Sequence, residues 1–227
     1  MIIAIDGTAG SGKTTTSKEV AKRLGFLHLD SGGLYRAFAL AARRHGWASP
    51  AGVVPAERIP QLAAQNVSGE VQAGDVAILL DGRRLGDELR SPAVSACASK
   101  VSVFPEIRAR VDEILRRIAA EFEGGIVCEG RDMGTVVFPQ AELKVFMQAG
   151  PEVRAERRIL QRGEEVTREG VRAEVQRLHT RDSADSGRKI SPLRQAEGAI
   201  VIDTTELSFD EQVGRILEAA ARRLDTA

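Results

Sequence analysis

The sequence predicts an α/β fold in which a parallel sheet is covered by helices. Two observations carry this prediction. Short apolar runs alternate with segments whose apolar residues recur at helical spacing, and the first run passes directly into a glycine-rich loop and then a helix. Buried strands of a parallel sheet read as continuous apolar runs. We therefore expect core strands at residues 2–5, 26–30, 125–129, 143–147 and 199–202.

The glycine-rich loop after the first strand matches the pattern Gly-x-x-x-x-Gly-Lys-Thr. Glycine lets the backbone turn its N–H groups around a polyphosphate, and the N-terminus of the following helix adds a favourable dipole. In this pattern Lys13 reaches the β- and γ-phosphates of ATP, and the Thr14 hydroxyl binds Mg²⁺. The alternative, an accidental glycine-rich turn, does not explain the strand-loop-helix context. The expected ATP-binding residues are Gly7, Thr8, Ala9, Gly10, Ser11, Gly12, Lys13, Thr14 and Thr15.

The second expected strand, like the first, is followed directly by polar residues. The helix after the loop is expected to run to Leu24, with Gly25 as its stop, and residues 26–30 form the strand. A further helix then extends to about Gly46. This arrangement places Asp30, Ser31 and Arg36 at the carboxyl edge of the sheet, where α/β folds bind ligands.

Residues 48–102 differ in character from the flanking sequence. Three prolines lie near the beginning of this segment, and two strands follow at 66–71 and 75–80, the second ending in the turn Asp81-Gly82. Residues 83–85 return as a third short strand, which indicates a small antiparallel insert. A helix at 92–100 leads out of the insert, and a longer amphipathic helix opens at Pro105.

The strand at 125–129 ends in Glu129, an acid at the position where nucleotide-binding folds help to hold Mg²⁺ directly or through water. The helix at 151–162 carries four arginines on one face. After it we expect a helix to about Arg181, a polar loop to Ser191, a strand at 199–202 and a helix to about Arg223. The four arginines are Arg154, Arg157, Arg158 and Arg162.

The composition excludes several classes of partner. The chain has 227 residues and zero net charge, so a general attraction to nucleic acid or to a membrane surface is not indicated. Cys97 and Cys128 form no Cys-x-x-Cys pair, and the three histidines have no ligand spacing. No apolar run reaches membrane-spanning length, and a strand starting at residue 2 leaves no room for a signal peptide. We expect a cytoplasmic monomer.

Five stretches of the chain form a pattern that runs nearly from end to end. They are 7–15; 29–36, which reads Leu-Asp-Ser-Gly-Gly-Leu-Tyr-Arg; 98–101 with Phe104-Pro105; 130–139, which reads Gly-Arg-Asp-Met-Gly-Thr-Val-Val-Phe-Pro; and 181–188. In these stretches the chain resembles the bacterial cytidylate kinases (CMP kinases) of the nucleoside-monophosphate kinase family. The 130–139 string is the most specific of them.

The resemblance implies both a fold and a reaction. The fold is that of a P-loop kinase: a five-stranded parallel sheet with the P-loop strand at its centre, helices on both faces, an antiparallel insert that binds the monophosphate, and a small lid. The core would comprise 1–47 and 103–227, the insert 48–102, and the lid about 151–165. The reaction is transfer of the γ-phosphoryl group of ATP to CMP or dCMP, with Mg²⁺ required and ATP as co-substrate.

The resemblance also implies roles for individual residues. Arg36, Arg131 and Arg188 would hold the CMP phosphate, with Ser31 and Tyr35 shaping that side of the cleft; Arg181 and Asp185 would hold the ribose; Ser99, Arg108 and Asp132 would read the cytosine. Lys13 and the lid arginines Arg154, Arg157 and Arg158 would be catalytic, offsetting the negative charge of two phosphate-bearing molecules. No general base is needed, because the CMP phosphate is already ionised at neutral pH.

Simpler structural roles stay open for some of these residues. The lid arginines could form a solvated helix face, and Arg108 could be a surface position. Asp185 could cap a loop, while Asp30 and Ser31 could serve a turn or helix N-cap.

Two other functions share the P-loop. One is another small-molecule kinase, of the thymidylate or shikimate type, and the other is a non-catalytic nucleotide-binding module. The Asn-Lys-x-Asp string by which GTPases read guanine does not occur in this chain.

Overall fold

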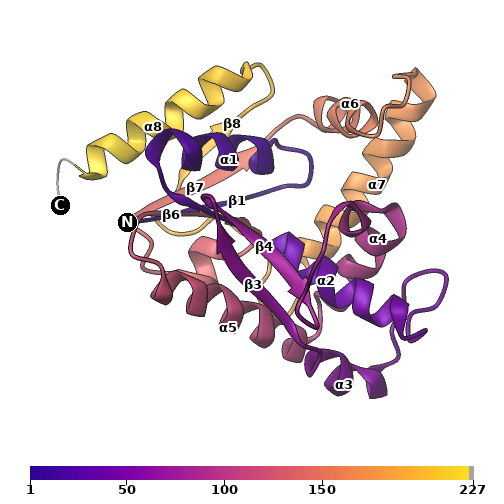
Figure 1. Ribbon diagram of the computed structural model, residues 1–227. Coiled ribbons are helices and arrows are strands. Elements are labelled where there is room, and N and C mark those ends of the chain that lie inside the picture. Colours follow the sequence, from indigo (N-terminus) through magenta and orange to yellow (C-terminus); the bar gives the residue numbers. More distant parts are fainter. Residues whose placement is uncertain (225–227) are drawn as a thin grey trace. The chain divides into compact units, whose positions relative to one another are not determined.

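The computed structural model describes residues 1–224, which form two compact units. Unit 1 comprises Met1–Phe26 and the chain from Gly125 onward, and unit 2 comprises Leu27–Gly124. Within unit 1 the strands pair in the order β6 (Ile126–Gly130), β1 (Ile2–Gly7), β7 (Leu143–Gln148) and β8 (Ile200–Asp203), so the P-loop strand β1 lies between two neighbours (Figure 1). Pairing along β6-β1-β7-β8 is parallel, so the predicted fold class is confirmed.

The elements of unit 1 follow the predicted order. Its strands are β1 (Ile2–Gly7), β6 (Ile126–Gly130), β7 (Leu143–Gln148) and β8 (Ile200–Asp203). Its α-helices are α1 (Lys13–Leu24), α6 (Pro151–Gln161), α7 (Arg168–Ser186) and α8 (Phe209–Leu224). A short π-helix at Met133–Val137, which the sequence did not predict, follows β6.

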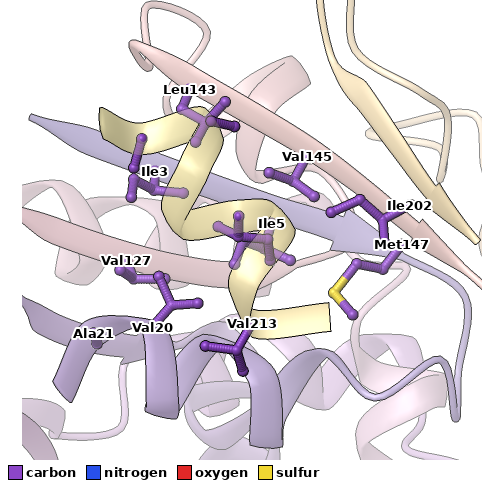
Figure 2. Close-up of a cluster of buried hydrophobic side chains, with 13 residues drawn as sticks. Ile3, Ile5, Val20, Ala21, Val127, Leu143, Val145, Met147, Ile202 and Val213 are labelled. Carbon is purple, nitrogen blue, oxygen red and sulfur yellow. The ribbon is translucent and has the colours of Figure 1, made fainter. Parts of the chain in front are cut away.

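The core of unit 1 lies between its sheet and the helices α1 and α8. Figure 2 shows Ile3 and Ile5 of β1 facing Val20 of α1 and Val213 of α8, and all four side chains are fully buried. Apolar area of this kind stabilises the folded state by roughly 25 cal/mol per Å². The strands are continuously apolar because they are buried against these helices. Polar side chains are found at the carboxyl ends of the strands instead.

Unit 2 contains the predicted antiparallel sheet. Its strands β3 (Val67–Gln72), β4 (Asp75–Leu80) and β5 (Arg83–Arg84) pair in that order. The unit begins with β2 (Leu27–Asp30) and α2 (Ser31–Arg44), and it also contains α3 (Ile59–Ala63), α4 (Pro92–Val101) and α5 (Pro105–Glu121). Two 3₁₀ turns, Ala56–Arg58 and Asp87–Arg90, complete it.

One helix boundary differs from the sequence prediction. The helix expected to end near Arg181 continues to Ser186 as α7. Ser and Asp have modest helix propensity, so the extra turn was not anticipated. Tertiary contacts of Asp182 and Asp185 with other elements, described below, supply the missing stabilisation.

No helix between residues 1 and 224 combines the length and the apolar character that crossing a membrane requires.

Candidate active site

The P-loop adopts a conformation that requires glycine at its first position. Gly7 has φ 148°, and a Cβ atom there would lie 1.9 Å from the carbonyl oxygen of Met147. Gly12, at φ 91°, begins helix α1, whose first N–H groups have no partner within the helix. Lys13 is buried, and its ammonium donates to the Thr8 carbonyl at 2.6 Å and to the Ser11 hydroxyl at 3.4 Å.

Lys13 lies in a positively charged environment. Burial, and after it the positive charges of Arg131 and Arg181, hold the Lys13 pKa well below its usual value. The carboxylates of Glu129 and Asp6 act in the opposite direction without cancelling this effect. A bound polyphosphate would relieve the repulsion among the three cations, so the arrangement favours an anionic ligand.

Thr14 and Glu129, the two residues expected to hold Mg²⁺, lie within hydrogen-bond distance of each other. The Thr14 hydroxyl donates to the Glu129 carboxylate at 2.9 Å, with Glu129 buried and Thr14 exposed. Oxygen donors of this kind suit Mg²⁺, which is usually bound by one or two protein side chains together with water and substrate phosphates. Within residues 1–224 no cluster of three or more His, Cys, Asp or Glu side chains could enclose a metal ion by itself.

Three of the residues assigned to CMP lie together in unit 1. Arg131 Nε donates to Asp185 Oδ2 at 2.9 Å, while Arg188 Nε donates to the Asp185 carbonyl at 3.1 Å. Burial alone would raise the Asp185 pKa, but Arg131, Arg188 and Arg181 outweigh it and hold that pKa below its usual value. Asp185 lies within helix α7, so the alternative of a loop cap is wrong.

Asp6 is a buried carboxylate that the sequence analysis did not single out. Its two oxygens accept from the backbone N–H groups of Met133 and Gly134, each at 2.8 Å. These bonds tie the last part of the P-loop strand to the segment just after Asp132, which is itself buried. The one feature of the sequence that could have pointed to Asp6 is its position directly before the first P-loop glycine.

Asp6 should give the protein a specific pH dependence. Burial, reinforced by Asp132 and opposed by the two backbone donors, raises the Asp6 pKa from 3.8 to about 6. The folded state therefore keeps a proton that the unfolded state has lost, and stability falls as pH rises through this window. Relative to Asp6→Asn, we expect the wild-type free energy of unfolding to drop by about 3 kcal/mol between about pH 4 and pH 7. Urea titrations at several pH values measure this difference, and parallel pH profiles for the two proteins would contradict it.

The lid arginines do not share one environment. Arg154 is only 8% exposed, so for this residue the alternative of a solvated helix face is wrong. Arg157 donates to the Thr204 hydroxyl at 2.9 Å and to the Thr204 carbonyl at 2.7 Å. Since the Thr204 hydroxyl in turn donates to the Ser11 carbonyl at 3.0 Å, Arg157 supports the P-loop through Thr204. Arg158 donates to Gln161 on its own helix at 3.0 Å.

In unit 2, α2 begins with polar groups as predicted. Ser31 is buried, and Arg36 donates to Asp30 Oδ2 at 2.6 Å. Although burial would raise the Asp30 pKa, Arg36 and His28 together lower it. The Nε atom of Arg36 is buried and has no hydrogen-bond partner within the described part of the chain, which leaves this arginine with donor capacity.

Ser99 and Arg108, the residues of unit 2 assigned to the base, are linked through Ser102. Arg108 lies with its guanidinium 5.4 Å from the centre of the Tyr35 ring and donates to the Ser102 carbonyl at 3.0 Å. The Ser102 hydroxyl then donates to the Ser99 carbonyl at 2.9 Å. Arg108 is 3% exposed, so a surface position is excluded for it.

The chain is similar in sequence to known proteins of one family. A family model described as Cytidylate kinase matches residues 3–222. The cytidylate kinase of Carboxydothermus hydrogenoformans is 40% identical over 230 residues, covering 99% of each chain. That of Caldanaerobacter subterraneus subsp. tengcongensis is 42% identical over 221 residues, covering 96% of this chain and 93% of the other.

Among solved structures, a protein from Thermus thermophilus is 16% identical with a TM-score of 0.51, covering 99% of this chain and 97% of the other. An uncharacterised protein from Eubacterium ventriosum is 12% identical with a TM-score of 0.51, covering 96% and 97% respectively. These two likenesses show the fold alone. Because the family model spans nearly the whole chain and full-length relatives are about 40% identical, this chain belongs to the cytidylate kinase family.

Proposed function

We propose that this chain transfers the γ-phosphoryl group of ATP to CMP or dCMP, giving ADP and the corresponding nucleoside diphosphate. The observation that carries the proposal is the buried P-loop lysine Lys13, whose ammonium donates to the Thr8 carbonyl at 2.6 Å and whose pKa is lowered by burial and by the positive charges of Arg131 and Arg181. A site of this kind suits two phosphate-bearing substrates. The names of the full-length relatives support cytidylate as the acceptor.

The proposed chemistry relies on position and charge. The attacking CMP oxygen is ionised at neutral pH, so the protein supplies alignment and positive charge and needs no general base. Lys13 is proposed to act on the β- and γ-phosphates of ATP. Arg158, which is partly exposed, is proposed to help offset the negative charge of the phosphates.

The residue roles for CMP follow the resemblance and are proposals. In unit 1, Arg131 and Arg188 would hold the CMP phosphate, Arg181 and Asp185 the ribose, and Asp132 the base. The ion pairing among Arg131, Asp185 and Arg188 supports this assignment, since it fixes both guanidinium groups before substrate arrives. In unit 2, Arg36, Ser31, Tyr35, Ser99 and Arg108 keep their implied roles.

Mg²⁺ is proposed to be held by Thr14 and Glu129 together with phosphate oxygens and water. When bound, it would neutralise part of the negative charge on the phosphates of ATP. A cytoplasmic location, a monomeric state and the absence of nucleic-acid or membrane partners are proposed as well, with zero net charge as the supporting observation.

An ADP-release assay with ATP tests the proposal against its two alternatives. We expect turnover with CMP and dCMP, weaker turnover with UMP, and none with AMP, GMP or shikimate. Chelating the divalent metal with EDTA should abolish turnover, and adding excess Mg²⁺ should restore it. Turnover with shikimate would favour another small-molecule kinase. Tight ATP binding without transfer to any acceptor would favour a non-catalytic module.

A further inference from the structure

The Ala9 peptide of the P-loop is bonded at both of its polar atoms. Its N–H donates to Asp182 Oδ1 of α7 at 3.2 Å, and its carbonyl accepts from Arg154 Nη1 of α6 at 3.1 Å. Arg154 Nη1 also donates to the Asp182 carboxylate, which closes a ring of three residues. We call this ring, made of Ala9, Arg154 and Asp182, the loop clamp.

Apolar packing surrounds the loop clamp. Ala9 is 3% exposed and belongs to a small buried cluster with Ala155 of α6 and Leu178 of α7. A Cβ atom on Gly10 would lie 3.1 Å from both the Cβ and the carbonyl oxygen of Arg154, so the loop backbone touches the beginning of α6. Hydrogen bonds between charged groups gain strength in such a dry environment. The tip of the P-loop is therefore fixed to α6 and α7 together.

The loop clamp changes the interpretation of Arg154. The resemblance implies that Arg154 is catalytic and offsets the negative charge of the phosphates, yet its Nη1 atom already donates to two protein acceptors. An ionised Asp182 so close to a phosphate-binding loop would repel ATP unless a cation balanced it, and Arg154 supplies that balance. Asp182 lies in the stretch 181–188 that carries the resemblance, but the resemblance implies no role for it.

We propose that Asp182 is a positioning residue for ATP. It fixes the Ala9 peptide and orients Arg154, so that the N–H groups of the P-loop are arranged before the nucleotide arrives. Arg154 then acts mainly by holding the loop and neutralising Asp182. This proposal rests on the proposed function for its kinetic predictions, but its binding predictions require only that the P-loop binds ATP.

A double-mutant cycle of Asp182→Asn and Arg154→Met tests the loop clamp. We expect Asp182→Asn to raise the KM for ATP about 5- to 10-fold and to leave the KM for CMP within about twofold. Arg154→Met leaves Asp182 uncompensated, so it should raise the KM for ATP by about 30-fold or more. The double variant should bind ATP no worse than Arg154→Met, because the repulsion is gone, whereas independent effects would multiply.

The controls separate this proposal from the proposed function and from misfolding. Calorimetric titration with ATP and Mg²⁺, without acceptor, repeats the cycle with no need for turnover, and thermal unfolding confirms that each variant is folded. Glu169→Gln removes an exposed charge from the same helix and should leave ATP affinity unchanged. Losses that multiply in the double variant would overturn the loop clamp and restore the implied catalytic role of Arg154. An equal rise in the KM for CMP on Asp182→Asn would also overturn it.

Discussion

Lys13→Ala is expected to lower kcat by about 1,000-fold or more while leaving the protein folded. Lys13 is the buried cation at the start of α1, and its ammonium is held by the Thr8 carbonyl and the Ser11 hydroxyl within the P-loop. Negative charge builds up between the two phosphates during phosphoryl transfer, and the ammonium of Lys13 is already in place to stabilise it. In the variant, water molecules would have to reorient before they could stabilise the same charge. Steady-state ADP release with saturating ATP and CMP measures the loss.

The same variant should change stability little. In the wild-type protein, burial and the charges of Arg131 and Arg181 lower the pKa of Lys13. The charged form of Lys13 is therefore disfavoured in the folded protein without substrate. Removing it loses two hydrogen bonds but also relieves repulsion. Lys18→Ala, at an exposed position of the same helix, is the matched control and should keep normal turnover. If Lys13→Ala retained near-normal turnover, the role of the P-loop lysine would be wrong.

Most of the fold could be predicted because its signals are local. Apolar runs mark the core strands, and helix α1 begins and ends beside glycines with positive φ, at Gly12 and Gly25. The elements that were missed depend on partners distant in sequence. The final turn of α7 is supported by bonds from Asp182 to Ala9 and from Asp185 to Arg131, more than fifty residues away in each case. The π-helix at 133–137 is anchored by Asp6 in the same way.

Those residues of the candidate site that belong to a sequence motif could be predicted. The P-loop pattern identified Lys13 and Thr14, and an acid at a strand end identified Glu129, which the structure places 2.9 Å from the Thr14 hydroxyl. Asp6 and Asp182 were not singled out because each accepts hydrogen bonds from backbone N–H groups of another segment. A hydrogen bond from a side chain to a distant backbone N–H leaves no spacing pattern in the sequence, so such residues are found only when the chain is folded.

Asp132→Asn is expected to narrow the preference for CMP over UMP in kcat/KM by about 10- to 100-fold. Asp132 is 1% exposed and lies directly before the π-helix that Asp6 holds in place. An ionised carboxylate can only accept hydrogen bonds, which suits the exocyclic amine of cytosine. Facing uracil, the same carboxylate would meet a carbonyl oxygen, and neither group could donate a hydrogen bond to the other. An amide offers both a donor and an acceptor and can serve either base.

The prediction about Asp132 is tested by competition between the two monophosphates at fixed ATP. In the variant, kcat/KM for CMP should fall while kcat/KM for UMP holds or rises, and the KM for ATP should stay within about twofold of the wild-type value. This last quantity matters, because Asp132 also acts on the charge of Asp6 at the end of the P-loop strand. A uniform fall for both monophosphates with a higher KM for ATP would assign Asp132 to holding the loop. An unchanged ratio of CMP to UMP would remove it from base recognition.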